Sequence, residues 1–403
     1  DGKGFAVKGY SYKTKEDGEG ALFGTIGAEG VVSNLTSAGE ISGGLGGPKG
    51  TTKLGHVGGF VGRLYGKLVN VTNTGKVKGI ATYNAGVAGF VQQGAVLDGV
   101  KNYGEITSSA AYVAGVAAYV YEDAEFNKCV NYGNISSSVA AGYAAGIAAT
   151  ALPSKFVECV NEGQISSGSS AGIVANCSGK SGGLIYTFDR CQNNGEVTGN
   201  GILGGITAVQ GATAGNNVCH YIQCVNNGDI TATATQAVSS SAMAGIAAFY
   251  SPGSVFEYCI NTGFVTNTKS VYTAGIAANN KGSATADYPV VFKGCVNTGN
   301  IASSAQQIAG IVAYITNYTS VDSCLNYGTI EQGIWGAAGI CYTMAGTTSS
   351  LTNCINYGDV SVTQYNAGGI VGNCASTTAV IENCVNVGNI TSTTTAEKNN
   401  YGV

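Results

Sequence analysis

Charged residues are scarce in this chain of 403 residues, because Lys, Arg, Asp and Glu together make up 10% of it, against roughly 25% in an ordinary globular domain. Only two arginines, Arg63 and Arg190, are present, and the net charge is −4. A nucleic-acid-binding surface needs a basic stripe, so no nucleic acid is expected as a partner. No apolar run approaches the ~18 residues of a membrane helix, so no transmembrane segment is predicted.

Groups that bind metals or perform catalysis are also few. His56 and His220 are the only histidines, and no Cys-x-x-Cys pair occurs, so neither a metal site nor a cofactor is predicted. The densest acidic group is Glu122, Asp123 and Glu125. It is interpreted either as a solvated bend or as a calcium or sugar contact. The sequence offers no catalytic constellation, and the chain is expected not to be an enzyme.

What the sequence does contain is a repeat. A phrase of Cys, a residue that is aliphatic in all copies but Cys191-Gln192, Asn, any residue, Gly, any residue, and Ile or Val begins at nine cysteines that lie 29 to 36 residues apart. These cysteines are Cys129, Cys159, Cys191, Cys224, Cys259, Cys295, Cys324, Cys354 and Cys384. Looser copies precede them at 37–41, 73–77 and 102–106.

Two further apolar segments complete each unit. One is a small residue followed by Gly and Ile or Val, as in Ala114-Gly115-Val116, and the other is a bulky apolar residue three positions before each cysteine, such as Phe126. Such short segments between Gly- and Asn-rich bends indicate strands, and no helical period appears. Because one unit cannot bury its own apolar face, the sequence predicts a right-handed parallel β-helix of about twelve rungs with three short strands per rung.

Stacking places identical residues above one another. The recurring asparagines are predicted to form a structural ladder of side-chain amides; they are Asn131, Asn161, Asn193, Asn226, Asn261, Asn297, Asn326, Asn356 and Asn386. The glycine two positions later is expected to adopt a left-handed conformation. The nine cysteines become a structural column of buried, unpaired thiols. A disulfide remains open among Cys177, Cys219, Cys341 and Cys374, which lie off the column.

The repeat predicts one solenoid domain over residues 1–403. Residues 1–60 form the N-terminal cap and first repeat, 61–390 the repeats, and 391–403 an incomplete last repeat. The first twenty residues contain eight charged side chains, as a polar cap over an open solenoid end requires. The sequence ends where the next small-Gly-Ile phrase is due, and we expect the chain to be part of a longer protein.

One segment resembles a known family. Gly-Ala-Leu-Phe-Gly-Thr-Ile-Gly at 20–27 and Val-Gly-Gly-Phe-Val-Gly at 57–62 are similar to the Gly-Leu-Phe-Gly and Val-Gly-Gly-Leu-Val-Gly phrases of GLUG-motif repeats. Those repeats occur in large secreted or surface proteins of bacteria, including the β-rich part of immunoglobulin-A-cleaving metallopeptidases. The resemblance implies a β-helical fold and an extracellular or cell-surface setting, but no activity, and the His-Glu-x-x-His of those peptidases is missing here.

Tyrosine stands between the ladder asparagine and its glycine at four places, Tyr103, Tyr132, Tyr327 and Tyr357. If these side chains point outward, they form two exposed pairs on one edge of the solenoid. Such pairs stack on each other or provide a platform for sugar rings or a protein partner.

Three repeats carry longer connections, of 16 or 17 residues instead of 10 to 12, between the small-Gly-Ile glycine and the next bulky residue. They are predicted to leave one corner and form a ridge. The ridge residues are Lys180, Tyr186, Asn216, Asn217, His220, Asn279, Asn280, Lys281, Asp287 and Tyr288. The ridge is interpreted either as a binding surface or as tolerated insertions.

These features favour a non-enzymatic adhesin or stalk module, extracellular or at the cell surface, whose partner is a glycan or a host surface protein. The alternative is a carbohydrate-active enzyme, a polysaccharide lyase or hydrolase built on a β-helix. Such an enzyme needs clustered carboxylates or a positioned basic residue.

Overall fold

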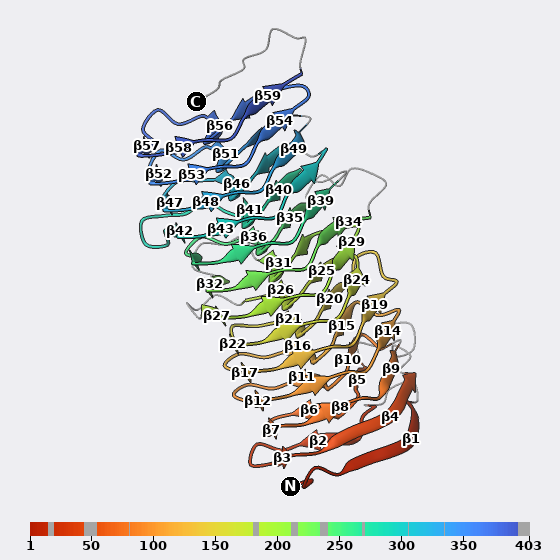
Figure 1. The fold of residues 1–403 in the computed structure, drawn as a ribbon. Coiled ribbons are helices and arrows are strands. Elements are labelled where there is room, and N and C mark those ends of the chain that lie inside the picture. The colour runs from red at the N-terminus through yellow and green to blue at the C-terminus, as the bar shows by residue number, and fades with distance from the viewer. Residues whose placement is uncertain are drawn as a thin grey trace, which may run out of the picture. The chain divides into compact units, whose positions relative to one another are not determined.

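The computed structural model describes residues 1–14, 20–43, 55–79, 81–179, 185–210, 217–233, 241–267, 271–304, 306–333 and 335–393. These residues form short β-strands joined by turns and bends, with no helix among them. The chain divides into two compact units, Asp1–Ser178 with Arg190–Thr198, and Gly179–Asp189 with Gly199–Val403. Each unit is a parallel β-solenoid in its own right, so the predicted β-helix is confirmed (Figure 1). The single domain over 1–403 stays a prediction.

The strands of unit 1 fall into four sheets. Sheet A contains β1 (Ala6–Thr14), β4 (Thr36–Gly43), β8 (Thr72–Asn73), β9 (Lys76–Gly79), β13 (Lys101–Asn102), β14 (Ile106–Ser108), β18 (Val130–Asn131), β19 (Ile135–Ser137), β23 (Val160–Asn161), β24 (Ile165–Ser167) and β28 (Gln192–Asn193). Sheet B contains β5 (His56–Gly58), β10 (Tyr83–Ala85), β15 (Tyr112–Ala114), β20 (Tyr143–Ala145) and β25 (Ser169–Ala171). Sheet C contains β2 (Phe23–Ile26), β6 (Val61–Leu64), β11 (Ala88–Val91), β16 (Ala117–Val120), β21 (Ala148–Ala151) and β26 (Val174–Cys177). Sheet D contains β3 (Val31–Ser33), β7 (Lys67–Val69), β12 (Val96–Asp98), β17 (Glu125–Asn127) and β22 (Lys155–Val157). Strand β29 (Val197–Gly199) ends one residue beyond unit 1.

Unit 2 has strands of the same four kinds. Sheet A contains β33 (Val225–Asn226), β34 (Ile230–Ala232), β38 (Ile260–Asn261), β39 (Val265–Asn267), β43 (Val296–Asn297), β44 (Ile301–Ser303), β48 (Leu325–Asn326), β49 (Ile330–Gly333), β53 (Ile355–Asn356), β54 (Val360–Val362), β58 (Val385–Asn386) and β59 (Ile390–Ser392). Sheet B contains β30 (Leu203–Gly204), β35 (Ala242–Ala244), β40 (Tyr272–Ala274), β45 (Gln307–Ala309), β50 (Gly336–Ala338) and β55 (Asn366–Gly368). Sheet C contains β31 (Thr207–Gln210), β36 (Ala247–Tyr250), β41 (Ala277–Asn280), β46 (Val312–Ile315), β51 (Cys341–Met344) and β56 (Val371–Cys374). Sheet D contains β27 (Ile185–Asp189), β32 (Val218–Ile222), β37 (Val255–Glu257), β42 (Val290–Lys293), β47 (Thr319–Asp322), β52 (Ser350–Thr352) and β57 (Val380–Glu382).

The three apolar segments predicted per rung are present, and two of them are bent. The Cys-x-Asn-x-Gly-x-Ile phrase supplies both strands of sheet A, divided at the Asn-x-Gly bend. The small-Gly-Ile phrase supplies one strand each to sheets B and C, divided after its glycine, and the bulky residue lies in sheet D. Each unit contains six sheet C strands, which agrees with the predicted twelve rungs.

The asparagine ladder is formed as predicted. In unit 1 the Nδ2 group of Asn131 donates to Asn161 Oδ1 at 2.8 Å and to the carbonyl of its own Gly133 at 2.9 Å. Its Oδ1 accepts from Asn102 Nδ2 at 2.8 Å. The same bonds run from Asn226 to Asn386 in unit 2. Each side chain therefore satisfies the bend of its own rung and binds both neighbouring rungs.

The prediction that the glycine of this bend is left-handed is wrong. None of the Asn-x-Gly glycines among the described residues has a positive φ. A Cβ on Gly104 would lie 1.8 Å from the carbonyl oxygen of Gly75 on the preceding rung. Glycine is thus required because the bends of successive rungs are in van der Waals contact. Similarly, a Cβ on Gly115 would lie 2.2 Å from Asn131 Oδ1. The glycine of the small-Gly-Ile phrase therefore lets the backbone between sheets B and C pack directly against the asparagine ladder.

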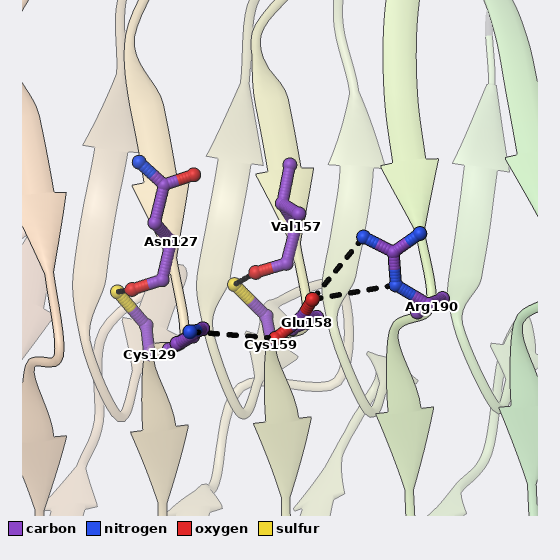
Figure 2. Close-up of polar contacts among 7 residues, drawn as sticks. Asn127, Cys129, Val157, Glu158, Cys159 and Arg190 are labelled. Atoms are coloured by element: carbon purple, nitrogen blue, oxygen red, sulfur yellow. Dashed lines mark hydrogen bonds and ion pairs between the residues drawn. The ribbon is translucent and has the colours of Figure 1, made fainter.

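Left-handed backbone occurs instead one residue before each column cysteine. Lys128 and Glu158 have φ of 51°, and Arg190 has φ of 49°. The bend turns sheet D into sheet A and directs these long side chains outward, where they pair across rungs. Figure 2 shows the Glu158 carboxylate beside the Arg190 guanidinium, whose Nη2 lies 3.1 Å away. The same carboxylate lies 3.9 Å from Lys128 Nζ.

The cysteine column is present, and none of the thirteen cysteines, all of which lie among the described residues, is in a disulfide. The Cys159 thiol donates to the carbonyl of Phe126 on the preceding rung at 3.4 Å, or to that of Val157 in its own rung at 3.6 Å (Figure 2). Cysteine is small enough for the corner and also supplies a weak donor to its carbonyls. Burial raises the pKa of the Cys129 and Cys341 thiols and keeps them protonated. Cys384 departs from the prediction, since it is only half-buried.

The bulky residues of sheet D form the inner column of each unit. The rings of Phe126 and Phe156 stack at 4.9 Å in unit 1. In unit 2 the Tyr221, Phe256 and Phe292 rings stack at 4.6 Å per step. These side chains are fully buried, so each ring contributes several kcal/mol of burial and dispersion, of the order of 3–5 kcal/mol for Phe→Ala.

The two terminal rungs differ. At the first, β1 pairs with β4, and the Tyr10 hydroxyl contacts Ser37 Oγ and the Gly59 carbonyl. Of the predicted charged cap, residues 15–19 lie outside the described residues. At the last described rung, Ile381 is 46% exposed, whereas the equivalent Leu351 is fully buried. Residues 394–403, which were assigned to the incomplete last repeat, lie outside the described residues.

The ladder predicts a large difference between inner and terminal asparagines. Replacing Asn326 by Ala should lower the free energy of unfolding by roughly 3 kcal/mol, because buried partners on both sides lose their bonds. Replacing Asn386 by Ala should cost about 1 kcal/mol, since it is half-buried and bonded from one side in the described structure. Urea titrations of both variants test this; equal losses would contradict the ladder.

The burial of the thiols predicts selective labelling. In the native protein a maleimide should label Cys374, which is exposed, rapidly and Cys384, which is half-buried, more slowly. The other eleven cysteines should react only in denaturant, where all thirteen should be found free. Mass spectrometry of alkylated peptides gives the count, and a recovered disulfide or labelling of a third cysteine in the native protein would disprove the arrangement.

Candidate functional site

Two columns of side chains run in register over sheets B and C of unit 1. Sheet B places His56, Tyr83, Tyr112, Tyr143 and Ser169 on successive rungs. Sheet C places Arg63, Phe90, Tyr119, Thr150 and Asn176 beside them. We call these ten residues, with Tyr121, the aromatic face.

The rings of the aromatic face pack in two directions. Along sheet B, Tyr83 and Tyr112 are nearly parallel at 4.8 Å, and Tyr112 and Tyr143 at 5.6 Å. Along sheet C, Phe90 and Tyr119 are nearly parallel at 5.3 Å. Between the columns, Tyr83 meets Phe90 at 76° and Tyr119 at 86°. Parallel-offset and edge-to-face contacts are the favourable ring geometries, so the rings support one another as a fixed surface.

Small residues make room for these rings. Ala85 and Ala118 are fully buried against Tyr83 and Phe90, with Tyr119 packed beside them. Ala85 is the small residue of the phrase that turns sheet B into sheet C, and Ala118 lies in the sheet C strand that follows the same phrase on the next rung. The same phrase that lets the solenoid wall bend therefore seats the aromatic columns next to the backbone.

The tyrosine hydroxyls of the face are neutral hydrogen-bonding groups. Burial, followed by the neighbouring Tyr112, Tyr119 and Tyr121, raises the pKa of Tyr83 to about 12. Burial also raises the pKa of Tyr119 and Tyr143. Tyr112, Tyr119 and Tyr143 are half-buried, so they are reachable from solvent while held in place.

A charged group stands at one end of the face. Arg63 Nη2 lies 3.2 Å from His56 Nε2, and the His56 ring lies 3.8 Å from the Phe90 ring. Burial, and secondly the Arg63 charge, lower the pKa of His56 to about 4. Neutral His56 therefore accepts from Arg63 through Nε2 and has its proton on Nδ1. Nδ1 is buried and lacks a hydrogen-bond partner among the described residues.

This combination suits a ligand with apolar faces and hydroxyl edges. Ring faces contact C–H groups, while phenol, hydroxyl and amide groups exchange hydrogen bonds. Beyond the rings, the Thr150 and Asn176 side chains bond each other at 3.4 Å. Thr150 is buried and Asn176 is half-buried, so the Asn176 amide is the accessible polar group of this pair. Sugars have this chemistry.

The corresponding surface of unit 2 is less aromatic. It contains Phe249, Tyr272 and Tyr314, and the last two rings meet edge to face at 5.8 Å. Lys281 Nζ lies 3.9 Å from the centre of the Phe249 ring. Asn279 lies between Phe249 and Tyr314 on sheet C, so the rings do not form an unbroken column.

The four tyrosines predicted between ladder asparagine and glycine do point outward in pairs. Tyr103 and Tyr132 stack at 4.5 Å in unit 1, and Tyr327 and Tyr357 at 4.7 Å in unit 2. All four are 41–49% exposed. Stacking is confirmed, and it covers one face of each ring. Their use as a binding platform stays a prediction.

The predicted ridge is not one continuous surface. Tyr186 is fully buried in β27, and Asn217 and Asn280 are 6% exposed, so these three residues belong to the interior and not to a ridge. His220 lies in sheet D and Asn279 in sheet C. Lys180 and Asn216 lie outside the described residues.

Three predicted ridge residues remain accessible in the connection of unit 2: Lys281, Asp287 and Tyr288. Lys281 lies over Phe249, and burial lowers the pKa of its amine. A Cβ on Gly253 would lie 3.3 Å from the Tyr288 ring. The connection therefore folds back over neighbouring rungs. Its role in binding stays a prediction.

The acidic group has the structure of a solvated bend. Glu125 pairs with Lys155 at 3.1 Å, and Asp123 accepts from Gln93 Nε2 at 3.3 Å. Among the residues that the structure describes, no cluster of three metal-ligating side chains occurs. No helix in that part of the chain is long and apolar enough to cross a membrane.

Sequence reasoning missed the aromatic face, although a signal was available. Tyr83, Tyr112 and Tyr143 each stand three residues before the glycine of the small-Gly-Ile phrase. Phe90 and Tyr119 stand four residues after it. The position before the glycine and the position after it lie on either side of one bend. Their side chains therefore face the same side of the solenoid.

The His56 environment predicts a pH dependence. The pKa of His56 is about 4 when folded and 6.5 in the unfolded reference state, so as pH falls the unfolded chain binds the proton first. Above about pH 6.5 the His56 imidazole leaves the free energy of unfolding unchanged. Between pH 6.5 and 4 its titration lowers the free energy of unfolding by up to about 3 kcal/mol. The stability difference between wild type and His56→Gln, followed by urea titration at each pH, should change over that window. Parallel curves would disprove the shift.

No family of known proteins, no curated protein and no solved structure matches this chain significantly.

Proposed function

We propose that this chain is a non-enzymatic adhesin or stalk module, extracellular or at a cell surface, that binds glycan through the aromatic face of unit 1. The observation that carries the proposal is the paired columns on sheets B and C, in which rings held by one another lie beside neutral hydroxyl and amide groups. The similarity of residues 20–62 to GLUG-motif repeats supports the extracellular setting.

The surface chemistry favours sugar over a peptide as the partner. A common way for an extended peptide to bind a β-protein is to add a strand to an open sheet edge, but the aromatic face lies on the broad side of sheets B and C. There the backbone groups already pair between rungs, as in Tyr112 with Tyr83 and Tyr143. Recognition on this side must use side chains, and those present are rings, hydroxyls and an amide.

The non-enzymatic part of the proposal is supported by the carboxylates. Acid–base cleavage of a glycan needs two carboxyl groups, or a positioned basic residue, on either side of the bond. Of the acidic group, Glu125 is bound to Lys155 and Asp123 is exposed at a bend. A host protein as partner would instead be expected to use the exposed Tyr327–Tyr357 pair.

Removing one ring from each column should weaken glycan binding. We expect Tyr112→Ala with Tyr119→Ala to lower affinity at least tenfold, which corresponds to about 1.4 kcal/mol. Binding is measured by a glycan array followed by calorimetry on the best oligosaccharide. The matched control is Tyr327→Ala with Tyr357→Ala, which removes two stacked tyrosines elsewhere and should leave binding unchanged.

Three results would contradict the proposal. They are absence of binding to any glycan of a broad array, loss of binding in the control alone, and release of new reducing ends or unsaturated sugars by the wild-type protein. The third result would establish the enzyme alternative. Thermal unfolding of both variants shows whether a loss of binding comes from a loss of structure.

A further inference from the structure

Unit 2 has an aliphatic column on its outer surface. Sheet A alternates between the inward ladder asparagines and the outward residue just before each of them, and the strands β43, β48, β53 and β58 can be followed as one stack in Figure 1. These outward residues lie in register on six successive rungs and are half-buried, or exposed at the last rung. We call them the aliphatic stripe: Val225, Ile260, Val296, Leu325, Ile355 and Val385.

The surface on both sides of the stripe is free of charge. At the positions two residues before and two residues after each stripe residue, the sequence of unit 2 contains no Asp, Glu, Lys or Arg. The same three positions in unit 1 include Lys101, Lys128, Glu158, Glu162 and Arg190. A contiguous apolar surface marks a site of association, and unit 2 differs here from unit 1 in a property that the core does not require.

We propose that two copies of this chain associate through the aliphatic stripe of unit 2. The copies run antiparallel, related by a two-fold axis that lies in the interface and crosses the stripe between Val296 and Leu325. Each rung then meets the rung at the same distance on the other side of the axis, and every column lies opposite the same column of the second copy. This inference uses unit 2 alone and does not depend on glycan binding by unit 1.

The side chains that meet in this arrangement complement each other in size. In the column two residues after the stripe, Thr298 meets Tyr327 of the second copy. One rung further from the axis, Thr262 meets Tyr357. The two tyrosines stack at 4.7 Å and are 48% and 41% exposed, so they form a fixed ridge. The threonines leave room for that ridge, which allows the two surfaces to pack closely.

The charges at the border of this surface fit the same arrangement. Lys293 and Asp322 lie on neighbouring rungs of sheet D, three residues before the stripe, and the two-fold axis passes between them. Lys293 of each copy therefore meets Asp322 of the other, which brings opposite charges together twice. Thr352 and Asn353 hold the Asp322 carboxylate with bonds of 2.7 and 2.8 Å. The remaining charged border residues meet uncharged positions; they are Asp229, Glu257, Glu331, Asp359 and Glu382.

Neighbouring registers bring like charges together. Displacing one copy by one rung places Lys293 opposite Lys293 in one direction. In the other direction it places Asp322 opposite Asp322 and Glu331 opposite Glu331. A parallel pair, with the axis along the stripe, places Asp322 opposite Glu331. Like charges across an interface disfavour the wrong pairing, so the charges select the antiparallel pair centred between Val296 and Leu325.

The size of the surface sets the expected strength of the dimer. Five rung steps of about 4.8 Å and four residue steps of about 3.3 Å give about 24 Å by 13 Å for the stripe and its two flanking columns. Such an interface lies at the lower end of the specific ones. The dimer is therefore expected to dissociate at micromolar concentrations.

Sedimentation velocity of the 403-residue chain between about 1 and 100 µM tests the association. The wild type should pass from monomer to dimer over that range. Leu325→Asp should weaken dimerisation at least tenfold, because it places a charge opposite Val296 of the second copy. The matched control is Val130→Asp, at the same repeat position on β18 of unit 1, which should leave dimerisation unchanged. Thermal unfolding checks that both variants are folded.

A charge swap tests the register. Lys293→Glu should weaken dimerisation several-fold, because two-fold symmetry places the new carboxylate opposite Asp322 twice. Adding Asp322→Lys to the same chain should restore the association, since each Glu then meets a Lys of the second copy. In a register displaced by one rung, or in a parallel pair, the double variant has no such contact to restore.

Each outcome supports or overturns a defined part of the proposal. A monomer at every concentration overturns the dimer and leaves the stripe to a different partner. Unchanged dimerisation in Leu325→Asp, or an equal loss in Val130→Asp, overturns the stripe as the interface. Failure of the double variant to regain association overturns the antiparallel register. If Leu325→Asp does not fold, the Lys293→Glu variant and the double variant decide both the interface and the register.

Discussion

The hydrogen bond from one ladder asparagine to the next is the interaction on which the rest of each unit depends. It fixes the register between rungs, because Asn131 can bond both Asn102 and Asn161 only when the three bends are superposed. That superposition brings the bend backbones into contact and leaves no room for a Cβ at Gly104. The repeat thus requires Asn and Gly together, and neither residue alone would maintain the spacing.

Once the register is fixed, every repeat position becomes a column. Inside, this gives stacked phenylalanines and thiols that bond the carbonyl of the preceding rung. Outside, the same geometry turns any tyrosine that recurs on neighbouring rungs into a stack, as at Tyr103 and Tyr132. The aromatic face is the case in which two such columns lie on either side of one bend, so that Tyr83 contacts both Phe90 and Tyr119.

The fold could be predicted from the sequence because its determinants are local phrases that recur: Cys129–Ile135 alone shows the strand, the bend and the ladder residue. The site could not be predicted in the same way. Sequence spacing showed that Gly172–Phe188 is long, but not that Tyr186 turns into the core as part of β27. Likewise, Tyr112 and Tyr119 are seven residues apart, and only the bend at Gly115 shows that they belong to one surface. The left-handed bend at Glu158 has no signal in residue type, since charged, aromatic and amide residues all occupy that position.

A surface made of repeated columns recognises a ligand differently from a pocket. Each ring or hydroxyl contributes about 1 kcal/mol or less beyond the area that it buries, and no single rung of the aromatic face encloses a sugar. Under the proposed function, binding would accumulate over rungs, and a linear glycan with a regular repeat could meet several rungs at once. A solenoid that repeats one rung many times can thereby acquire a distinct outer surface through the identity of a few side chains, without any change to its core.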